Sequence, residues 1–183
     1  FKATADQLKA AITPKTKAII FSSPCNPTGS VFLKEELEAI AKVLSDRKDI
    51  IVIADEIYEK INFTGDHISI GTLPGMLERT VTVNGFSKGY AMTGWRAGYI
   101  GAPLWLAKAA NKIQGQLTSA NCSIAQRAAY TAITSPDDES KKMASSSPSD
   151  STRKSIFACE SSLIITSVAE TVIATSLSLW IFV

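Results

Sequence analysis

Short apolar runs alternate with amphipathic stretches along the first 133 residues, and this alternation limits the possible folds more than any other feature of the chain. Residues 17–22 (KAIIFS) and 50–54 (IIVIA) are nearly continuous apolar runs rich in β-branched side chains. Such runs are typical of strands that are buried on both faces of a parallel sheet. Residues 80–84 (TVTVN) and 97–100 (AGYI) predict two further strands.

Helical patterns separate these predicted strands. Residues 33–44 (LKEELEAIAKVL) place apolar side chains at helical spacing and charged side chains on the opposite face. Residues 4–12 and 104–117 are also predicted to be helical. The alternation predicts an α/β fold with right-handed crossovers. Because ligands bind at the carboxyl ends of the strands in such folds, we expect the functional residues there.

Composition argues against several classes of function. The chain has 183 residues, of which 45% are apolar, and its net charge of +2 is too balanced for a nucleic-acid-binding surface. The single histidine, His67, leaves no pair for a histidine-based metal site, and we expect it to lie in an exposed loop. Three separated cysteines form no even disulfide framework, which favours a reducing, cytoplasmic setting.

Composition also divides the chain near Ser135. Residues 1–133 contain 15 Lys or Arg, 11 Asp or Glu and 8 Ser, whereas residues 134–183 contain 4, 6 and 13. We interpret the first part as one domain and the second as a Ser-rich and apolar tail that is disordered or results from a wrong reading frame or exon boundary. The apolar run 163–183 is long enough for a membrane span, but Glu170 and six Ser or Thr residues argue against an anchor.

Unusual polar residues follow two of the predicted strands. The first strand precedes the segment SPCNPTG, in which two prolines hold the backbone of Asn26 extended, although a plain strand-to-helix turn also fits. The second strand precedes Asp55 and, three residues later, Tyr58. A carboxylate at the mouth of a buried strand is costly without a cationic partner. A helix N-cap is the alternative role for Asp55.

The third strand leads into the segment GFSKGYAMTGWRAGYIG. Lys88 lies there among small residues, and desolvation favours the nucleophilic amine that Schiff-base chemistry requires. Arg96 follows eight residues later, and its guanidinium suits a phosphate group. Each of the two residues also fits an ordinary surface cation. The combined pattern provides the groups that hold a phosphorylated pyridine aldehyde, namely Asn26, Asp55, Tyr58, Lys88 and Arg96.

These segments resemble those of fold-type-I, pyridoxal-phosphate-dependent aminotransferases of class I/II, within the aspartate and aromatic aminotransferase group. SPCNPTG resembles the NPTG turn of the family, ADEIY its cofactor-aspartate segment, and GFSKGYAMTGWRAGYIG its lysine and phosphate-arginine segment. The resemblance covers residues 1–133 and implies an incomplete large domain, an α/β three-layer sandwich with a mostly parallel sheet. It also implies pyridoxal 5'-phosphate as cofactor, no metal, and transamination between an L-amino acid, aspartate or aromatic, and a 2-oxo acid in amino-acid metabolism.

The same resemblance implies a role for the first four matching residues. Lys88 is implied to be catalytic: it holds the cofactor covalently and moves a proton between the substrate α-carbon and the cofactor. Asp55 is implied to pair with the pyridine nitrogen, which makes the ring an electron sink. Asn26 and Tyr58 are implied to hydrogen-bond the phenolic oxygen of the ring.

The resemblance also assigns the phosphate contacts and the partners. Arg96 and Ser87 are implied to bind the phosphate, and Gly85 stands where many relatives carry a second phosphate-binding serine. The longer parent protein is expected to be a homodimer that binds a small-molecule amino acid and a 2-oxo acid, with neither nucleic acid nor a membrane as partner.

Two alternative functions stay open. One is another fold-type-I reaction, of the C–S β-lyase or ACC-synthase type, although the stretch YAMTGWRAGY resembles aminotransferases more closely. The other is a catalytically dead fragment. Since the chain does not begin with Met and lacks the family's stacking aromatic and carboxylate-binding arginine, we expect a piece of a longer enzyme with weak or no activity alone.

Overall fold

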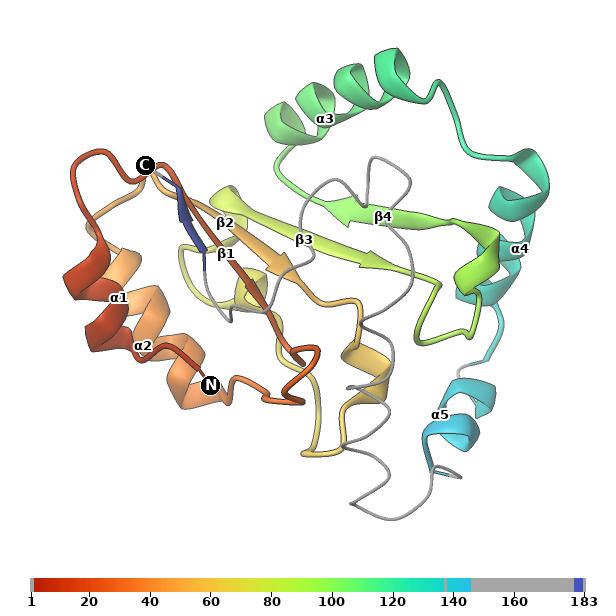
Figure 1. Ribbon diagram of the computed structural model, residues 1–183, viewed down its shortest axis with the longest axis horizontal. Helices are drawn as coiled ribbons and strands as arrows, with labels where there is room; N and C mark the ends of the chain where they lie inside the picture. Colours follow the sequence, from red (N-terminus) through yellow and green to blue (C-terminus); the bar gives the residue numbers. More distant parts are fainter. Residues whose placement is uncertain (1, 137, 146–179, 183) are drawn as a thin grey trace.

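A five-stranded sheet forms the centre of the computed structural model, which describes residues 2–136, 138–145 and 180–182 (Figure 1). Its strands, in the spatial order β4-β3-β2-β1-β5, are β1 (Ala18–Ser22), β2 (Ile51–Asp55), β3 (Thr80–Gly85), β4 (Gly98–Gly101) and β5 (Trp180–Phe182). The four strands expected from the sequence are confirmed to within one residue at each end. β1, β2 and β3 run parallel, and β4 and β5 run antiparallel to their neighbours.

The connections between strands explain these directions. The helix α2 (Lys34–Leu44) lies between β1 and β2, so the chain crosses over and the two strands become parallel. Between β3 and β4 the only helix is the single turn η4 (Thr93–Trp95), which is too short for such a crossover. The chain therefore returns beside β3 as an antiparallel edge strand, which the sequence analysis did not anticipate.

Two helices cover one face of the sheet. α1 (Ala5–Ala11) and α2 lie together on that face (Figure 1). A capping box starts α1, because the Gln7 N–H donates to Thr4 Oγ1 and the Thr4 N–H donates to Gln7 Oε1. The helices and strands enclose one large apolar core, whose members include Leu8, Ile19, Phe21, Leu37, Ile40, Leu44, Val52 and Met76.

Burial along β2 alternates from residue to residue. Val52 and Ala54 are fully buried, whereas Ile51 and Ile53 remain partly exposed. The α/β class and the mostly parallel sheet are confirmed, but the expected burial of β2 on both faces is not. The difference arises because α1 and α2 pack on the same face of the sheet.

Three more helices follow β4. α3 (Leu104–Leu117) confirms the expected helix, whereas α4 (Ser123–Thr134) and α5 (Asp138–Ser145) were not expected. α3 and α4 lie on the β4 side of the sheet, and α5 lies against the short helix η1 (Glu59–Ile61). None of the residues in α3 is buried.

Much of the expected tail lies outside the described residues. The Ser-rich stretch 146–150 and residues 163–179 of the apolar run belong to that part, whereas the run ends in β5. Within the described ranges, no helix combines the length and apolar character needed to cross a bilayer. The boundary near Ser135 stays a prediction.

Candidate functional site

The carboxyl ends of three parallel strands bring the three sequence motifs to one edge of the sheet. Asp55, the last residue of β2, pairs in register with the last residue of β1 and with Val83 of β3. The Ser23 N–H donates to Asp55 O at 3.0 Å, and the Glu56 N–H donates to Val83 O at 2.9 Å. The segments that follow β1, β2 and β3 therefore leave the sheet side by side.

A hydrogen bond joins the first two of these segments. Asn26 Nδ2 donates to the Tyr58 hydroxyl oxygen at 3.1 Å, and Tyr58 is only 7% exposed. The other end of the Asn26 amide, Oδ1, is buried and accepts no hydrogen bond from the described part of the chain. The Gly29 N–H donates to Cys25 O at 2.7 Å, which tightens the turn that presents Asn26. The peptide bonds before both prolines of this turn are cis.

Asp55 combines a local capping contact with an unusual electrostatic environment. Its Oδ1 accepts a hydrogen bond from the Ile57 N–H at 3.2 Å, so the capping role and the cofactor role can coexist. Burial raises the pKa of the Asp55 carboxyl, and the neighbouring charge of Glu56 raises it further. Across the described ranges no cation forms an ion pair with Asp55. A cationic ligand group would relieve this desolvated carboxylate.

Lys88 lies on the turn directly after β3 and faces the same tyrosine. Its Nζ is 5.7 Å from the centroid of the Tyr58 ring. The turn packs closely against η1, because a Cβ on Gly89 would lie 2.8 Å from Lys60 Cδ. Any other residue at position 89 would push these two segments apart. Tyr58 thus contacts both Asn26 and Lys88.

Ser87 and Arg96 form a second group on the connection between β3 and β4. Thr93 links them, because its Oγ1 donates to Ser87 O at 3.0 Å and Arg96 Nη1 donates to Thr93 O at 2.8 Å. Arg96 adopts the left-handed conformation, with φ of 53° and ψ of 49°. This conformation costs a non-glycine residue roughly 1 kcal/mol or more and is found most often at functional sites.

Gly85 fits a close approach between β3 and β4. A Cβ at this position would lie 3.1 Å from both Ala97 O and Gly98 Cα, and 3.3 Å from Ile57 Cδ1. Two of these three atoms belong to the backbone and cannot move aside easily. The serine that many relatives carry here would therefore crowd the β4 backbone in this chain.

Two expectations outside the motifs are wrong. His67 does not lie in an exposed loop: its side chain is 13% exposed, and its Nε2 lies 2.9 Å from Oε2 of Glu56, which is 4% exposed. A glutamate directly after a buried strand requires a partner, and this was the signal that could have identified the pair. Trp95, expected in the core, is 47% exposed.

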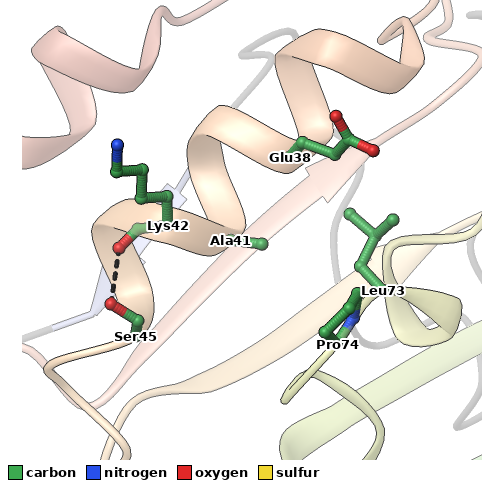
Figure 2. A pocket seen from close by; sticks show the side chains of 6 residues that line it. All are labelled: Glu38, Ala41, Lys42, Ser45, Leu73 and Pro74. Atoms are coloured by element: carbon green, nitrogen blue, oxygen red, sulfur yellow. Dashed lines mark hydrogen bonds between the residues drawn. The ribbon is translucent and has the colours of Figure 1, made fainter.

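A hollow of about 220 Å³ lies elsewhere on the molecule, between α2 and the turn that follows the short helix η2 (Ile70–Thr72). Figure 2 shows its lining residues, four from α2 and two from the turn, with the Ser45 hydroxyl hydrogen-bonded to Lys42 O. These residues are Glu38, Ala41, Lys42, Ser45, Leu73 and Pro74. None of the candidate site residues lines it.

Several known proteins share this sequence and fold. The chain is 50% identical over 127 residues to the bifunctional aspartate aminotransferase and glutamate/aspartate-prephenate aminotransferase of Petunia hybrida, covering 69% of this chain and 26% of that protein. It is 49% identical over 125 residues to an aspartate aminotransferase of Pyrococcus abyssi, covering 68% of this chain and 31% of that protein.

Solved structures show the same similarity. The aspartate aminotransferase from Rhizobium meliloti matches with a TM-score of 0.76 and 39% identity, over 79% of this chain and 37% of that one. The aromatic aminotransferase from Pyrococcus horikoshii matches with a TM-score of 0.74 and 42% identity, over 79% of this chain and 39% of that one. The chain thus spans roughly a third of the length of these relatives.

A family model extends the match along most of the chain. The model for aminotransferase class I and II matches residues 1–153, which include all three motif segments. The sequence motifs, the mostly parallel sheet and the solved structures all agree with this match. The chain belongs to the class I and II aminotransferase family.

Proposed function

We propose that the protein of which this chain forms part catalyses pyridoxal-phosphate-dependent transamination between an L-amino acid and a 2-oxo acid. Members of the family use pyridoxal phosphate. The observation that carries the proposal is the hydrogen bond between Asn26 and Tyr58, formed next to the desolvated carboxylate of Asp55. The relatives are named as aspartate, prephenate or aromatic aminotransferases, which supports aspartate or an aromatic amino acid as substrate.

The residues at the strand ends fit the cofactor chemically. The unpartnered end of the buried Asn26 amide needs a hydrogen-bond partner. Because the amide can rotate by half a turn about its Cβ–Cγ bond, that end can accept or donate a hydrogen bond. Asp55 needs a cation, and the protonated nitrogen of a pyridine ring is one.

Three side chains would hold and orient the ring. The Asp55 carboxylate would hold the positive charge at the ring nitrogen, and the buried pair Asn26 and Tyr58 would hydrogen-bond the ring hydroxyl. Pyridoxal phosphate, when bound, supplies an electron-withdrawing ring that stabilises negative charge at the substrate α-carbon. The positions of these side chains on three strand ends fix the orientation of the ring before substrate arrives.

The remaining residues would perform covalent attachment, proton transfer and phosphate binding. Lys88 Nζ would bind the cofactor aldehyde between turnovers and, once substrate displaces it, take the proton from the substrate α-carbon and deliver it to C4′ of the cofactor. Arg96 would pair with the phosphate through its guanidinium, assisted by the Ser87 hydroxyl. The left-handed backbone at Arg96 supports a site at which the position of this side chain matters.

We further propose that the longer protein acts as a homodimer in the cytoplasm. Large apolar side chains are exposed on α3 and α4, which supports a surface that a second copy covers. This partner accompanies the small-molecule amino acid and 2-oxo acid that transamination requires.

The reaction class is tested on a longer protein that contains this chain. With L-aspartate, L-tyrosine or L-phenylalanine and 2-oxoglutarate, we expect equal amounts of a new 2-oxo acid and glutamate by chromatography. The variant Lys88→Ala loses this activity. Release of ammonia and pyruvate from cysteine conjugates would assign a β-lyase instead. Full activity in Lys88→Ala, or none in the wild-type protein, contradicts the proposal.

A further inference from the structure

The single histidine of the chain closes a loop around the candidate site. The segment that starts at Glu56 leaves the sheet directly after Asp55, carries Tyr58 and passes through η1. It ends at His67, whose Nε2 lies 2.9 Å from Glu56 Oε2 across a separation of 11 residues. This contact therefore ties the end of the segment to its beginning.

Both partners of this contact are withdrawn from water. Glu56 is 4% exposed and the His67 side chain is 13% exposed. The Glu56 N–H donates to Val83 O at 2.9 Å, so the main chain is fixed to β3 while the side chain faces His67. Among the residues that the structure describes, His67 is the only side chain that pairs with Glu56. Removal of the imidazole would leave a buried carboxylate without compensation.

The same short stretch of backbone carries two of the proposed cofactor ligands. Asp55 precedes Glu56, and its Oδ1 accepts from the Ile57 N–H at 3.2 Å. The Glu59 N–H donates to Glu56 O at 2.9 Å, so Tyr58 lies inside a turn that begins at Glu56. The Glu56 charge also contributes to the raised pKa of Asp55, after the larger effect of burial. A proton donor that faces Glu56 reduces this unfavourable influence on Asp55.

We propose that His67, acting through Glu56, is a positioning residue that fixes the turn presenting the Asp55 carboxylate and the Tyr58 hydroxyl to pyridoxal phosphate. His67 touches neither substrate nor cofactor in this role. The proposal takes its ligand from the proposed function, but the hydrogen bond that it invokes can be tested without that ligand.

A bound cation is the competing explanation for this cluster. One ligand atom each of Glu56, Glu59 and His67 lie within 4.8 Å of one another. Two tetrahedral zinc ligands of this kind would lie roughly 3.3 Å apart, whereas Nε2 and Oε2 are at hydrogen-bond distance, 2.9 Å. The buried His67 Nδ1 has no partner in the described residues, although metal-binding histidines usually donate that N–H to a further group. Both features favour the hydrogen bond.

The first test measures amide hydrogen exchange by NMR in the 183-residue chain without cofactor. In His67→Ala we expect protection at Ile57 and Glu59 to fall about tenfold relative to the amides of β1 and β2, because the turn loses its tie. In His67→Gln, whose amide can donate to Glu56, protection stays within about twofold of wild type. The matched control Asp66→Ala, an exposed neighbour, should change neither amide.

Three results would overturn the positioning role. A uniform loss of protection across β1 and β2, with no extra loss at Ile57, would indicate a purely structural contact. A failure of His67→Gln to restore protection would exclude the hydrogen bond. Zinc that increases Ile57 protection in the wild-type chain but not in His67→Ala would assign the cluster to a cation. If His67→Ala does not fold, the double variant Glu56→Gln/His67→Ala, which has no buried charge, replaces it in the comparison.

The second test titrates pyridoxal phosphate and follows its absorbance. We expect the Kd to rise about tenfold in His67→Ala and to stay within about threefold of wild type in His67→Gln. An unchanged Kd in His67→Ala overturns the role toward the cofactor. If the wild-type chain takes up no pyridoxal phosphate, the proposed function fails for this chain, while the exchange experiment still decides whether His67 holds the turn.

Discussion

The part of the chain from α1 to β3 and the part from β4 to α4 differ in how far they bury their own apolar side chains. All buried members of the large core lie between Leu8 and Met76. In the second part, α3 buries none of its residues, and the small cluster beside it contains only Phe86, Ala97 and Ala129. The exposed apolar side chains of α3 and α4 are Leu104, Trp105, Ile113, Leu117, Ile124, Tyr130 and Ile133.

This difference shows which walls of the candidate site the chain can build by itself. Asn26, Asp55 and Tyr58 belong to the part with the large core, and their contacts are complete enough to hold them in place. Lys88 and Arg96 lie on the connection to β4, where the supporting core is small. We therefore expect mutations in the first part to affect stability, and mutations on α3 and α4 to affect association.

The largest loss of stability is expected at Arg79. This residue is 5% exposed, and its guanidinium donates to Arg47 O and Leu44 O at the end of α2. Arg79→Ala leaves two carbonyl groups without donors, so the free energy of unfolding should fall by about 3 kcal/mol in urea denaturation. The control Arg127→Ala, on exposed α4, should cost less than about 0.5 kcal/mol. Equal losses would contradict the contrast between the two parts.

The next largest effect is expected at Asp55 and has opposite signs for binding and stability. Asp55→Asn should weaken pyridoxal phosphate binding at least about tenfold, because it removes a charge-assisted hydrogen bond. Because the pKa of Asp55 is raised above 3.8 in the folded chain, the folded state keeps a proton that the unfolded state has lost, and stability falls as pH rises through this interval. The variant lacks this penalty.

Asp55→Asn should therefore be more stable than wild type at neutral pH, with the advantage disappearing below pH 3.8, where both states of the carboxyl are protonated. Urea denaturation across this pH range measures the difference. The exposed carboxyl of Asp66, changed to Asn, is the control and should show no such gain. A stability gain without loss of cofactor binding would argue against Asp55 as a ligand.

A smaller loss is expected where β3 meets β4. Gly85→Ala places a Cβ 3.1 Å from the β4 backbone and should cost about 1–2 kcal/mol by urea denaturation. Gly101→Ala, in β4 but with no atom within 4 Å of the added Cβ, should stay within about 0.5 kcal/mol of wild type. If the two variants behave alike, the close approach at Gly85 does not limit this position.

The smallest effect on stability is expected on the exposed helices. Replacing Leu117 and Ile124, which are 64% and 69% exposed, by Gln should change the free energy of unfolding by less than about 0.5 kcal/mol. The same replacement should lower self-association in analytical ultracentrifugation, because it removes apolar contact surface. Wild-type chain that stays monomeric at every concentration would contradict a second copy as the partner of this surface.

The sequence predicted the parts of the fold that depend on local patterns. β1, β2 and β3 were identified from continuous apolar runs, and α2 from its amphipathic spacing. The direction of β4 was not predicted, although the short connection before it contains no crossover helix. α4 was missed because attention to the polar residues 118–121 ended the helical region too early.

The candidate site was predictable to the same limit. Motif order brought Asn26 and Tyr58 together correctly, since parallel strand ends share one edge. The pair of Glu56 and His67 was missed because it depends on how an 11-residue loop folds back, which no local pattern specifies. The left-handed conformation at Arg96 was also invisible, because non-glycine residues rarely adopt it.

The most direct test of a cofactor site at these strand ends is the position of the covalent label. The chain is incubated with pyridoxal phosphate and reduced with borohydride, which fixes a pyridoxyl group on the attached lysine, and peptide mass spectrometry locates that group. We predict one label per chain, on Lys88, and no label at this level in Lys88→Ala. Labels spread over surface lysines, or equal labelling of wild type and Lys88→Ala, would contradict the site.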